Sequence, residues 1–345
     1  MKELHVGIIG CGSITQQRHI PEYTANPQVT IHGFFDRTAS RSQTMVDQYG
    51  GQVYPDIDSL LNDPAIDAVS ICVSNAQHAL LTIQALQAGK DVLCEKPMAT
   101  TLEDCRAMVA AAKESGHRLL IDQNQRLTKA HQTARQLVAN GELGQVLSFK
   151  TTFGHGGPET WSVDKGPQTW FFNKKASQYG AIFDLGIHKI DVVQYILDTN
   201  FNSAYAKLLT LDKKGPDGQP IEVDDNAMGI LTTPSGIIGT LTASWTYYGE
   251  EDNSTTIYGT DGIMKIYVDP EYSITLTKRD GTKVNYQLEA IQTNDNQTAS
   301  GVIDEFVDAL NGQRPSILDG NRVLASMEAV FACIESSQVG HAIEF

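Results

Sequence analysis

The chain has 345 residues, of which 41% are hydrophobic and 19% charged, a composition typical of a globular protein large enough for two domains. Its 26 lysines and arginines face 41 aspartates and glutamates, so the formal net charge is −15. That balance argues against a nucleic acid or a membrane surface as partner, because both require a basic face. No charged-then-apolar leader and no apolar stretch near about 18 residues occurs in the sequence, so we expect neither export nor a membrane span.

The cysteines are odd in number and follow no metal-binding spacing. They are Cys11, Cys72, Cys94, Cys105 and Cys333. Three of them lie in or beside predicted buried strands. We therefore expect reduced core cysteines in a cytoplasmic protein, and we expect no metal site.

The chain opens with a short apolar strand, residues 4–9, which is closed by a Gly-x-Gly turn that begins at Gly10. This pattern is typical of a dinucleotide-binding fold. The first glycine permits the tight turn, and the second lets the backbone approach a pyrophosphate at the N-terminus of the next helix. Thr15 stands where the fingerprint has a third glycine, which weakens the match. The expected cofactor contacts in this turn are Gly10, Gly12, Ser13 and Ile14.

A second predicted strand, residues 29–36, ends in Asp36, about 24 residues after Gly12. A carboxylate at this distance accepts hydrogen bonds from the adenosine ribose hydroxyls and repels a 2′-phosphate, so it favours NAD over NADP. Arg37 beside it could stack on adenine or bind a phosphate, which keeps NADP possible. The alternative is an ordinary strand-end aspartate that caps the next helix.

Strand and helix patterns alternate as far as about residue 123. The further predicted strands are residues 66–73, 91–94 and 118–121, and the predicted helices are residues 13–23, 39–49, 57–61, 76–88 and 102–115. Such alternation predicts an α/β domain with a doubly wound parallel sheet, in which ligands bind beyond the carboxyl ends of the strands. We expect residues 1–123 to form a Rossmann NAD(P)-binding domain.

The pattern changes after one more predicted helix, residues 129–140, to short alternating strands separated by turn signals such as Asp280-Gly281. These strands are residues 146–153, 205–211, 227–232, 237–245, 255–258, 264–268, 274–277 and 284–288. Helices near residues 302–311 and 321–339 close the chain. We expect residues 124–345 to form an α+β substrate and oligomerisation domain with a large, mainly antiparallel open-faced sheet. Its C-terminal helix could pack back on the first domain.

Ser74, Asn75 and His78 follow the predicted strand 66–73, at the sheet edge where the cofactor should bind. Asn75 can cap the next helix and also face the cofactor, and His78 lies in the first turn of that helix. A capping asparagine with a partly buried histidine is an equally good interpretation.

Glu95-Lys96-Pro97 follows the predicted strand 91–94. The proline biases Lys96 away from helical geometry, which directs a long cation from the strand end toward the expected cleft. There Lys96 could hold a substrate hydroxyl near the nicotinamide, and we expect Glu95 and Lys96 to contact the cofactor. A solvated lysine before a loop proline is the alternative. Arg126 marks the domain crossover and could bind substrate or pair with an acid.

The segment from Asp184 to Leu197 is predicted to be helical, with Asp184, His188 and Asp191 on one polar stripe. A carboxylate near an imidazole fixes its tautomer and stabilises its protonated form. Such a unit could take a proton from an alcohol, although a structural histidine paired with aspartate is an open alternative.

His155, Trp161 and Trp170 lie in the irregular stretch that precedes Asp184. Aromatic rings and a histidine in a long glycine-containing loop suit stacking on a sugar ring, and they equally suit a domain interface.

These motifs, in this order, resemble the Gfo/Idh/MocA family, which includes glucose–fructose oxidoreductase and inositol dehydrogenase. The resemblance spans essentially the whole chain and rests on Gly10-x-Gly12, Ser74-Asn75-x-x-His78, Glu95-Lys96-Pro97 and Asp184-x-Gly186-x-His188. It implies NAD(P) in the Rossmann domain and a sugar, cyclitol or related polyol as substrate. It also implies a homodimer or homotetramer formed through the open sheet face.

The resemblance further implies that Lys96 is the active-site lysine, Asp184 a substrate-binding or histidine-orienting acid, and His188 the general acid/base. The sequence departs from the family pattern at Thr15, at Ser74 in place of proline, and at Tyr179-Gly180-Ala181 in place of a run of glycines. None of these departures removes a reacting group, but the third could change the shape of the substrate pocket.

The expected activity is an NAD-dependent dehydrogenase or reductase that acts on a sugar or cyclitol hydroxyl. Two alternatives remain. One is an NAD-dependent glycosidase that oxidises a sugar transiently, and the other is a non-enzymatic NAD(P)-sensing regulator. The intact Lys96, Asp184 and His188 argue against a regulator, which has no need of reacting groups.

Overall fold

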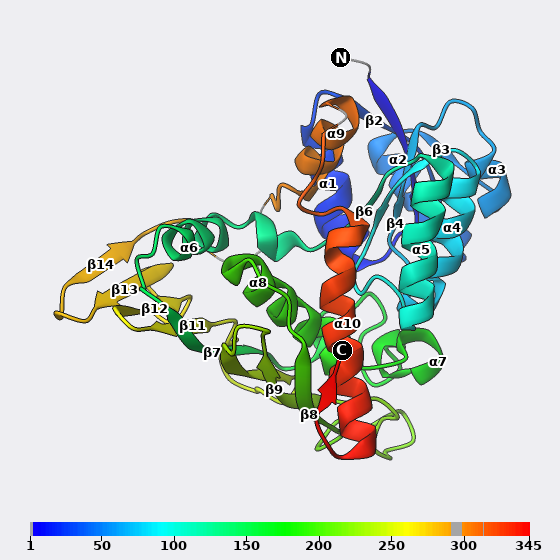
Figure 1. Ribbon diagram of the computed structural model, residues 1–345. Helices are drawn as coiled ribbons and strands as arrows, with labels where there is room; N and C mark the ends of the chain where they lie inside the picture. Colours follow the sequence, from blue (N-terminus) through cyan, green and yellow to red (C-terminus); the bar gives the residue numbers. More distant parts are fainter. Residues whose placement is uncertain (1–2, 291–298, 313) are drawn as a thin grey trace. The chain divides into compact units, whose positions relative to one another are not determined.

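The computed structural model describes residues 3–290, 299–312 and 314–345. The chain divides into two compact units (Figure 1). The first unit takes in residues 1–124 and 292–324, and the second takes in residues 125–291 and 325–345.

The first unit contains, within its described residues, a six-stranded parallel sheet of order β3-β2-β1-β4-β5-β6. The strands are β1 (Leu4–Ile9), β2 (Val29–Phe35), β3 (Gln52–Val53), β4 (Ala68–Ile71), β5 (Asp91–Cys94) and β6 (Leu119–Ile121). The strand order reverses between β1 and β4, which is the switch point where a doubly wound sheet binds its ligand. The predicted parallel sheet is confirmed. The sequence analysis missed β3, because two residues carry too little pattern.

Helices connect these strands, and α4 and α5 pack against each other (Figure 1). The helices are η1 (Thr15–His19), α1 (Ile20–Ala25), α2 (Ala39–Tyr49), α3 (Ile57–Leu61), η2 (Asn75–Gln77), α4 (His78–Gln87) and α5 (Leu102–Ser115). The Thr101 side chain caps α5 by accepting a bond from Asp104 N over 3.0 Å, and Gly116 ends it with φ +73°. The predicted helix 13–23 begins instead as the π-helical turn η1.

The first unit is completed by a late segment of the chain that contains α9 (Val302–Gly312) and the start of α10 (Gly320–Val339). The amide of Ile121 in β6 donates to the Leu318 carbonyl over 2.9 Å. Glu22 accepts a bond from Ser300 N over 2.7 Å, and Asn26 donates to Asp304 over 2.8 Å. These bonds tie the late segment to α1 and to the end of the sheet.

The second unit contains, within its described residues, a nine-stranded sheet of order β14-β13-β12-β11-β7-β10-β9-β8-β15. The strands are β7 (Val146–Gly154), β8 (Ser203–Leu209), β9 (Asn226–Thr232), β10 (Ile238–Ser244), β11 (Thr255–Gly259), β12 (Gly262–Ile266), β13 (Ile274–Lys278), β14 (Lys283–Tyr286) and β15 (Ile343–Glu344). The pair β7–β10 is parallel and the other pairs are antiparallel, so the predicted mainly antiparallel sheet is confirmed.

Two helices, α6 (Lys129–Ala139) and α8 (Ile187–Leu197), pack together over one face of this sheet (Figure 1). The remaining short elements are η3 (Asn124–Leu127), η4 (Pro158–Thr160), η5 (Trp170–Phe172), α7 (Lys174–Ser177) and η6 (Ile182–Gly186). The sequence analysis expected neither α7 nor β15. Asp184 lies in the π-helical turn η6, ahead of the regular helix α8 that carries His188.

The five cysteines are all buried and none forms a disulfide, as the sequence analysis expected. Among the described residues, no helix has both the length and the apolar character that a membrane crossing requires.

Candidate active site

The glycine turn after β1 has the geometry that close approach of a ligand requires. Gly10 has φ +97°, and a Cβ at this position would lie 2.3 Å from the Cys72 carbonyl oxygen, so only glycine fits. A Cβ on Gly12 would meet no atom within 4 Å, so the space beside it is open. The first glycine therefore serves the turn itself, and the second leaves room at the start of the helix, where a pyrophosphate would be received.

Thr15 has a structural role in place of the third glycine of the fingerprint. Its hydroxyl is fully buried and donates to the Gly10 carbonyl over 2.7 Å. This bond ties the first turn of η1 back to the glycine turn. Thr15 therefore replaces close backbone packing with a side-chain hydrogen bond and leaves the Gly-x-Gly segment intact.

Asp36, at the end of β2, holds the glycine turn directly. Its Oδ2 accepts a bond from Cys11 N over 2.8 Å, and its Oδ1 accepts one from Thr38 N over 2.8 Å. The second bond is the local turn that precedes α2, which is close to the alternative interpretation of a capping aspartate. Arg37 is exposed beside it. Contacts of these two residues with an adenosine ribose stay a prediction.

His78 is buried and joins two of the predicted site segments. Its Nδ1 lies 2.7 Å from the Pro97 carbonyl oxygen, and its Nε2 lies 3.1 Å from the Val73 carbonyl oxygen. Burial lowers the pKa of His78. The ring thus links the turn that contains Ser74 and Asn75 to the turn that contains Lys96, which positions both. Direct contact between His78 and a cofactor stays a prediction.

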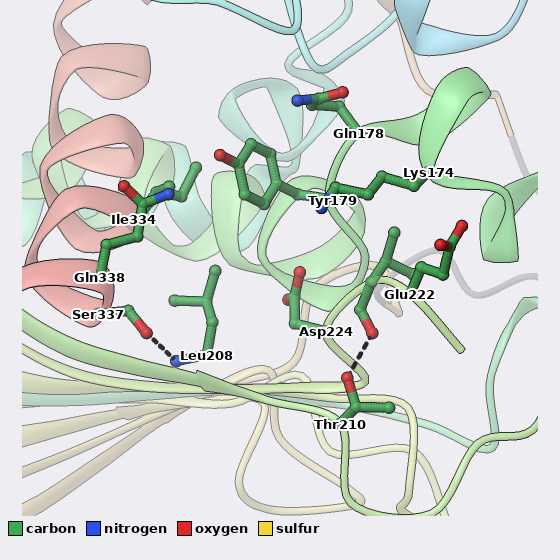
Figure 2. Close-up of a pocket in the computed structure, with 11 residues that line it drawn as sticks. Lys174, Gln178, Tyr179, Leu208, Thr210, Glu222, Asp224, Ile334, Ser337 and Gln338 are labelled. Carbon is green, nitrogen blue, oxygen red and sulfur yellow. Dashed lines mark hydrogen bonds between the residues drawn. The ribbon is translucent and has the colours of Figure 1, made fainter. Parts of the chain in front are cut away.

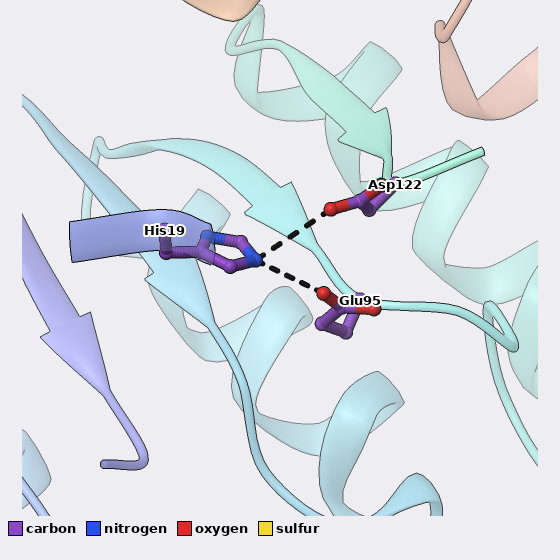
Figure 3. Close-up of side chains that lie close together, drawn as sticks. All are labelled: His19, Glu95 and Asp122. Carbon is purple, nitrogen blue, oxygen red and sulfur yellow. Dashed lines mark hydrogen bonds and ion pairs between the residues drawn. The ribbon is translucent and has the colours of Figure 1, made fainter. Parts of the chain in front are cut away.

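A buried acid–base cluster lies at the carboxyl ends of β5 and β6 (Figure 3). His19 Nε2 is 3.0 Å from Glu95 Oε1 and 3.6 Å from Asp122 Oδ2. The other oxygen of Glu95 accepts a bond from Lys96 N over 3.2 Å. Arg18 Nη1 lies 3.8 Å from Asp122 Oδ1. The cluster therefore connects η1 to the backbone of the predicted active-site lysine.

Burial and charge set the protonation of this cluster. Burial alone would lower the pKa of His19, but Cys72 and Glu95 raise it well above its ordinary value. Burial would raise the pKa of Glu95, but the bond from His19 and the nearby cations hold it well below its ordinary value. Burial and the charge of Glu95 raise the pKa of Asp122 to about 7. His19 and Glu95 thus form an ion pair, and Asp122 is the member that titrates near neutral pH.

His19, Glu95 and Asp122 each also offer one potential metal-ligand atom, all within 4.8 Å of one another. The cationic charge that a metal ion would bring is supplied here by His19 and Arg18. We therefore describe the group as an ion-pair cluster.

In the second unit, Asp184 and His188 are both buried, with exposed fractions of 6% and 8%. Asp184 Oδ2 accepts a hydrogen bond from the indole Nε1 of Trp245 over 3.0 Å. Trp245 directly follows β10, and its own amide donates to the Asp225 carbonyl over 2.8 Å. The acid of the Asp-x-Gly-x-His motif is therefore fixed to the end of a strand.

A chain of aromatic contacts joins this motif to the loop residues that sequence analysis predicted to bind substrate. The Phe153 ring lies 6.0 Å from His188 and 5.8 Å from His155. His155 is 6.3 Å from Trp161, which in turn is 5.1 Å from Phe171.

The chain ends in a stack and returns to the motif. Phe171 stacks on Trp170 at 3.9 Å and lies 6.4 Å from Trp245. The structure therefore brings His155, Trp161 and Trp170 into one cluster with His188 and Trp245, the partner of Asp184. Lys96 and the glycine turn belong to the other unit.

Arg126 forms a buried bidentate ion pair. Its Nε donates to Asp191 Oδ2 over 2.7 Å, and its Nη2 donates to Asp191 Oδ1 over 2.6 Å. Ser326 also donates to Asp191 over 2.7 Å. This geometry is that of an acid partner, one of the two interpretations left open for Arg126. Its contact with substrate stays a prediction.

Sequence reasoning missed His19, Asp122, Asp224 and Trp245. Asp122 directly follows the last strand of the parallel sheet, so the strand-end argument could have found it. His19 and Trp245 had no local signal, because their partners Glu95 and Asp184 are far away in the sequence. Asp224, which holds the start of η6, lies before a strand and resembles an ordinary turn residue.

Comparison with known proteins agrees with this architecture. Residues 4–123 match the family described as an oxidoreductase family with an NAD-binding Rossmann fold, and residues 131–265 match the GFO/IDH/MocA C-terminal domain. Levoglucosan dehydrogenase from Pseudarthrobacter phenanthrenivorans is 29% identical over 295 residues, which cover 76% of this chain and 73% of that protein. The 1,5-anhydro-D-fructose reductase from Ensifer adhaerens is 27% identical over 345 residues, which cover 98% of this chain and 97% of that protein.

Among solved structures, an oxidoreductase domain protein from Kribbella flavida has a TM-score of 0.88 at 22% identity, over 100% of this chain and 99% of that one, which shows a shared fold. The protein is thus an oxidoreductase with an NAD-binding Rossmann domain. It belongs to the Gfo/Idh/MocA family, as the order of its motifs indicates.

Proposed function

We propose that the protein transfers a hydride between a secondary hydroxyl carbon of a cyclic sugar or cyclitol and NAD. The observation that carries this proposal is the cluster in the second unit that joins Asp184, His188 and the aromatic loop residues. It combines an acid–base pair suited to a hydroxyl with flat rings suited to the apolar face of a sugar. The two relatives named above are named for anhydrosugars, which supports a cyclic sugar here.

Each unit has its own part in the proposed reaction. In the first unit, residues Gly10 to Ile14 bind the pyrophosphate, and Asp36 and Asn75 bind other parts of the cofactor. NAD, when bound, supplies the hydride acceptor. Lys96 places the reacting oxygen of the substrate, and the Glu95 carboxylate fixes the Lys96 backbone. We assign cofactor binding to residues 1–123, and substrate binding and oligomerisation to residues 124–345.

In the second unit, His188 takes the hydroxyl proton as the carbon loses its hydride, and it returns that proton in the reverse direction. Asp184 stabilises the charged imidazole or binds a neighbouring hydroxyl, and Trp245 sets the direction of its carboxylate. His155, Trp161 and Trp170 hold the sugar ring in place, which confines the reacting carbon to one position.

We also propose a homodimer or homotetramer formed through the outer face of the nine-stranded sheet. Tyr205 and Ile230 are paired across β8 and β9 and are 40% and 43% exposed. Met228 and Ile238, on β9 and β10, are each 47% exposed. A patch of this kind marks an interaction surface. Light scattering tests it, because a charge introduced by Ile230→Lys should lower the measured mass, whereas a monomeric wild type would contradict the proposal.

A cytoplasmic location remains part of the proposal. It is supported by five cysteines that are buried and free of disulfides.

The activity is tested by offering the purified protein NAD or NADP with a panel of anhydrosugars, aldoses, cyclitols and glycosides, while NADH absorbance is followed. We expect NADH to accumulate with one class of cyclic sugar or polyol. Glycoside cleavage without net NADH would favour the glycosidase instead. Tight NAD binding without turnover of any member of the panel would count against the proposed reaction.

A further inference from the structure

The acid Asp224 lies beside a cavity of about 200 Å³ in the second unit. Figure 2 shows it together with Tyr179, Glu222 and Gln338, which also line this cavity. Asp224 is only 6% exposed, whereas Glu222, two residues earlier, is exposed. The two acids thus share one cavity but differ in burial.

Asp224 binds three consecutive backbone amides where the chain enters η6. Its Oδ1 accepts a bond from Gly180 N over 2.7 Å, and its Oδ2 accepts one from Ile182 N over 2.8 Å. Its backbone carbonyl accepts a bond from Ala181 N over 2.8 Å. The first amides of a helix have no partner within the helix, so a carboxylate there satisfies donors that would otherwise be buried and unbonded.

Gly180 permits this close approach. A Cβ at position 180 would lie 1.9 Å from the Asp224 carbonyl oxygen and 2.9 Å from the Trp245 ring. Any side chain would therefore separate the two segments. This explains why glycine occurs at the centre of Tyr179-Gly180-Ala181.

The same two acidic positions hold Asp184 from a second direction. Asp184 lies two residues after Ile182, within η6. Trp245, which donates to its carboxylate, is itself bonded through its amide to the carbonyl of Asp225. The backbone start of η6 and the side-chain partner of Asp184 are therefore both anchored at residues 224–225.

We propose that Asp224 is a positioning residue for Asp184, acting through the backbone of η6. This inference rests on the proposed function, in which Asp184 serves substrate binding or orients His188. A carboxylate offers acceptors on both oxygens, whereas the amide of asparagine would direct an N–H₂ group at one of the two backbone donors. Loss of one bond would let η6 move relative to Trp245, and a displacement near 1 Å is enough to impair a catalytic arrangement.

The test compares Asp224→Asn with Glu222→Gln, which removes the same charge from the same cavity. Hydrogen–deuterium exchange of the peptide that contains residues 180–186 needs no substrate. We expect faster exchange there in Asp224→Asn and wild-type exchange in Glu222→Gln. Equal exchange in the two variants would overturn the proposal.

The kinetic comparison separates positioning from a general loss of fold. We expect kcat/KM for the sugar to fall by roughly tenfold or more in Asp224→Asn, while the Kd for NAD, which binds to the other unit, stays within about twofold of wild type. Wild-type kcat/KM in this variant would overturn the inference and leave the proposed function intact. Lack of turnover by the wild type itself would count against the proposed function, while the exchange measurement would still decide the inference.

If Asp224→Asn does not fold, Trp245→Phe takes its place, because it removes only the indole N–H that holds Asp184. We expect the same kinetic pattern from this variant. Unchanged kcat/KM would show that Asp184 needs no anchoring at residues 224–225, which would overturn the proposal.

Discussion

The indole Nε1 of Trp245 donates a hydrogen bond to Asp184 Oδ2 over 3.0 Å, although 61 residues separate them in the sequence. Trp245 is fully buried, and its bond fixes the acid of the Asp-x-Gly-x-His motif to the residue that follows β10. One oxygen of the carboxylate is thereby given a defined direction beside His188. The proposed chemistry depends on this relationship, and the predictions begin from it.

Trp245→Phe should lower kcat/KM for the sugar by about tenfold, since a buried hydrogen bond to a charged group contributes about 1.5–3 kcal/mol. The ring contacts with Phe171 and Phe172 should persist, so stability should change less than activity. Steady-state kinetics and thermal unfolding measure the two effects. A variant that unfolds far earlier but keeps full kcat/KM would contradict this role.

The two glycines of the first turn should respond differently to alanine. Gly10→Ala places a Cβ against the Cys72 carbonyl at φ +97°, so we expect a loss of about 1–3 kcal/mol in the free energy of unfolding or more. Gly12→Ala meets no atom within 4 Å, so it should fold normally and weaken NAD binding. Denaturant unfolding and NAD titration of both variants make the comparison. Normal NAD affinity in Gly12→Ala would contradict the assigned pyrophosphate site.

Asp122 should make stability depend on pH. Its pKa is raised from 3.8 to about 7 in the folded chain, by burial and by the charge of Glu95, with Arg18, His19 and Glu22 also close. A raised pKa means that the folded state binds the proton more tightly. The stabilisation is therefore complete below pH 3.8 and is lost as the pH rises through about 7.

Asp122→Asn removes this titration. Relative to wild type, its free energy of unfolding should rise with pH across that window, by a few kcal/mol at about 1.4 kcal/mol per pKa unit. Asp58→Asn, an exposed acid of the same unit, serves as the control. A pH-independent difference between Asp122→Asn and wild type would contradict the assignment.

Arg126 and Asp191 should behave as one unit. Arg126→Ala leaves the buried Asp191 carboxylate without its bidentate partner, and we expect a loss of about 3–5 kcal/mol in the free energy of unfolding. Replacement of both residues by apolar ones of similar size should recover much of that loss. If Arg126→Lys instead folds normally and raises only KM for the sugar, the predicted contact of Arg126 with substrate would gain support.

The sequence predicted the parallel sheet well, because buried strands and the helices between them carry strong local patterns. The boundaries of α2, α3, α5 and β5 match the prediction, and those of the other long elements differ by a few residues. It also predicted the sheet of the second unit, although β15, β3 and α7 are too short to show a pattern. Turn residues such as Asp280-Gly281 separated the antiparallel strands correctly.

The candidate site was predictable only where chemistry and chain position coincide. The glycine turn, Lys96 and His188 lie at strand ends or in a compact motif, and a short stretch of sequence identifies them. The bonds Trp245–Asp184, His19–Glu95 and Asp224–Gly180 join residues 44 or more positions apart. Only the packed fold brings these partners together, so no local pattern could indicate them.

The most direct test of the account compares wild type with His188→Asn, using the sugar that the substrate panel identifies. Asparagine keeps a similar size and polarity but cannot exchange the proton. The account predicts that kcat falls by about 10²–10⁴-fold while the Kd for NAD is unchanged, because general acid–base catalysis contributes in that range. A variant that binds NAD normally and turns over the sugar near the wild-type rate would contradict the assignment of His188 and, with it, the proposed mechanism.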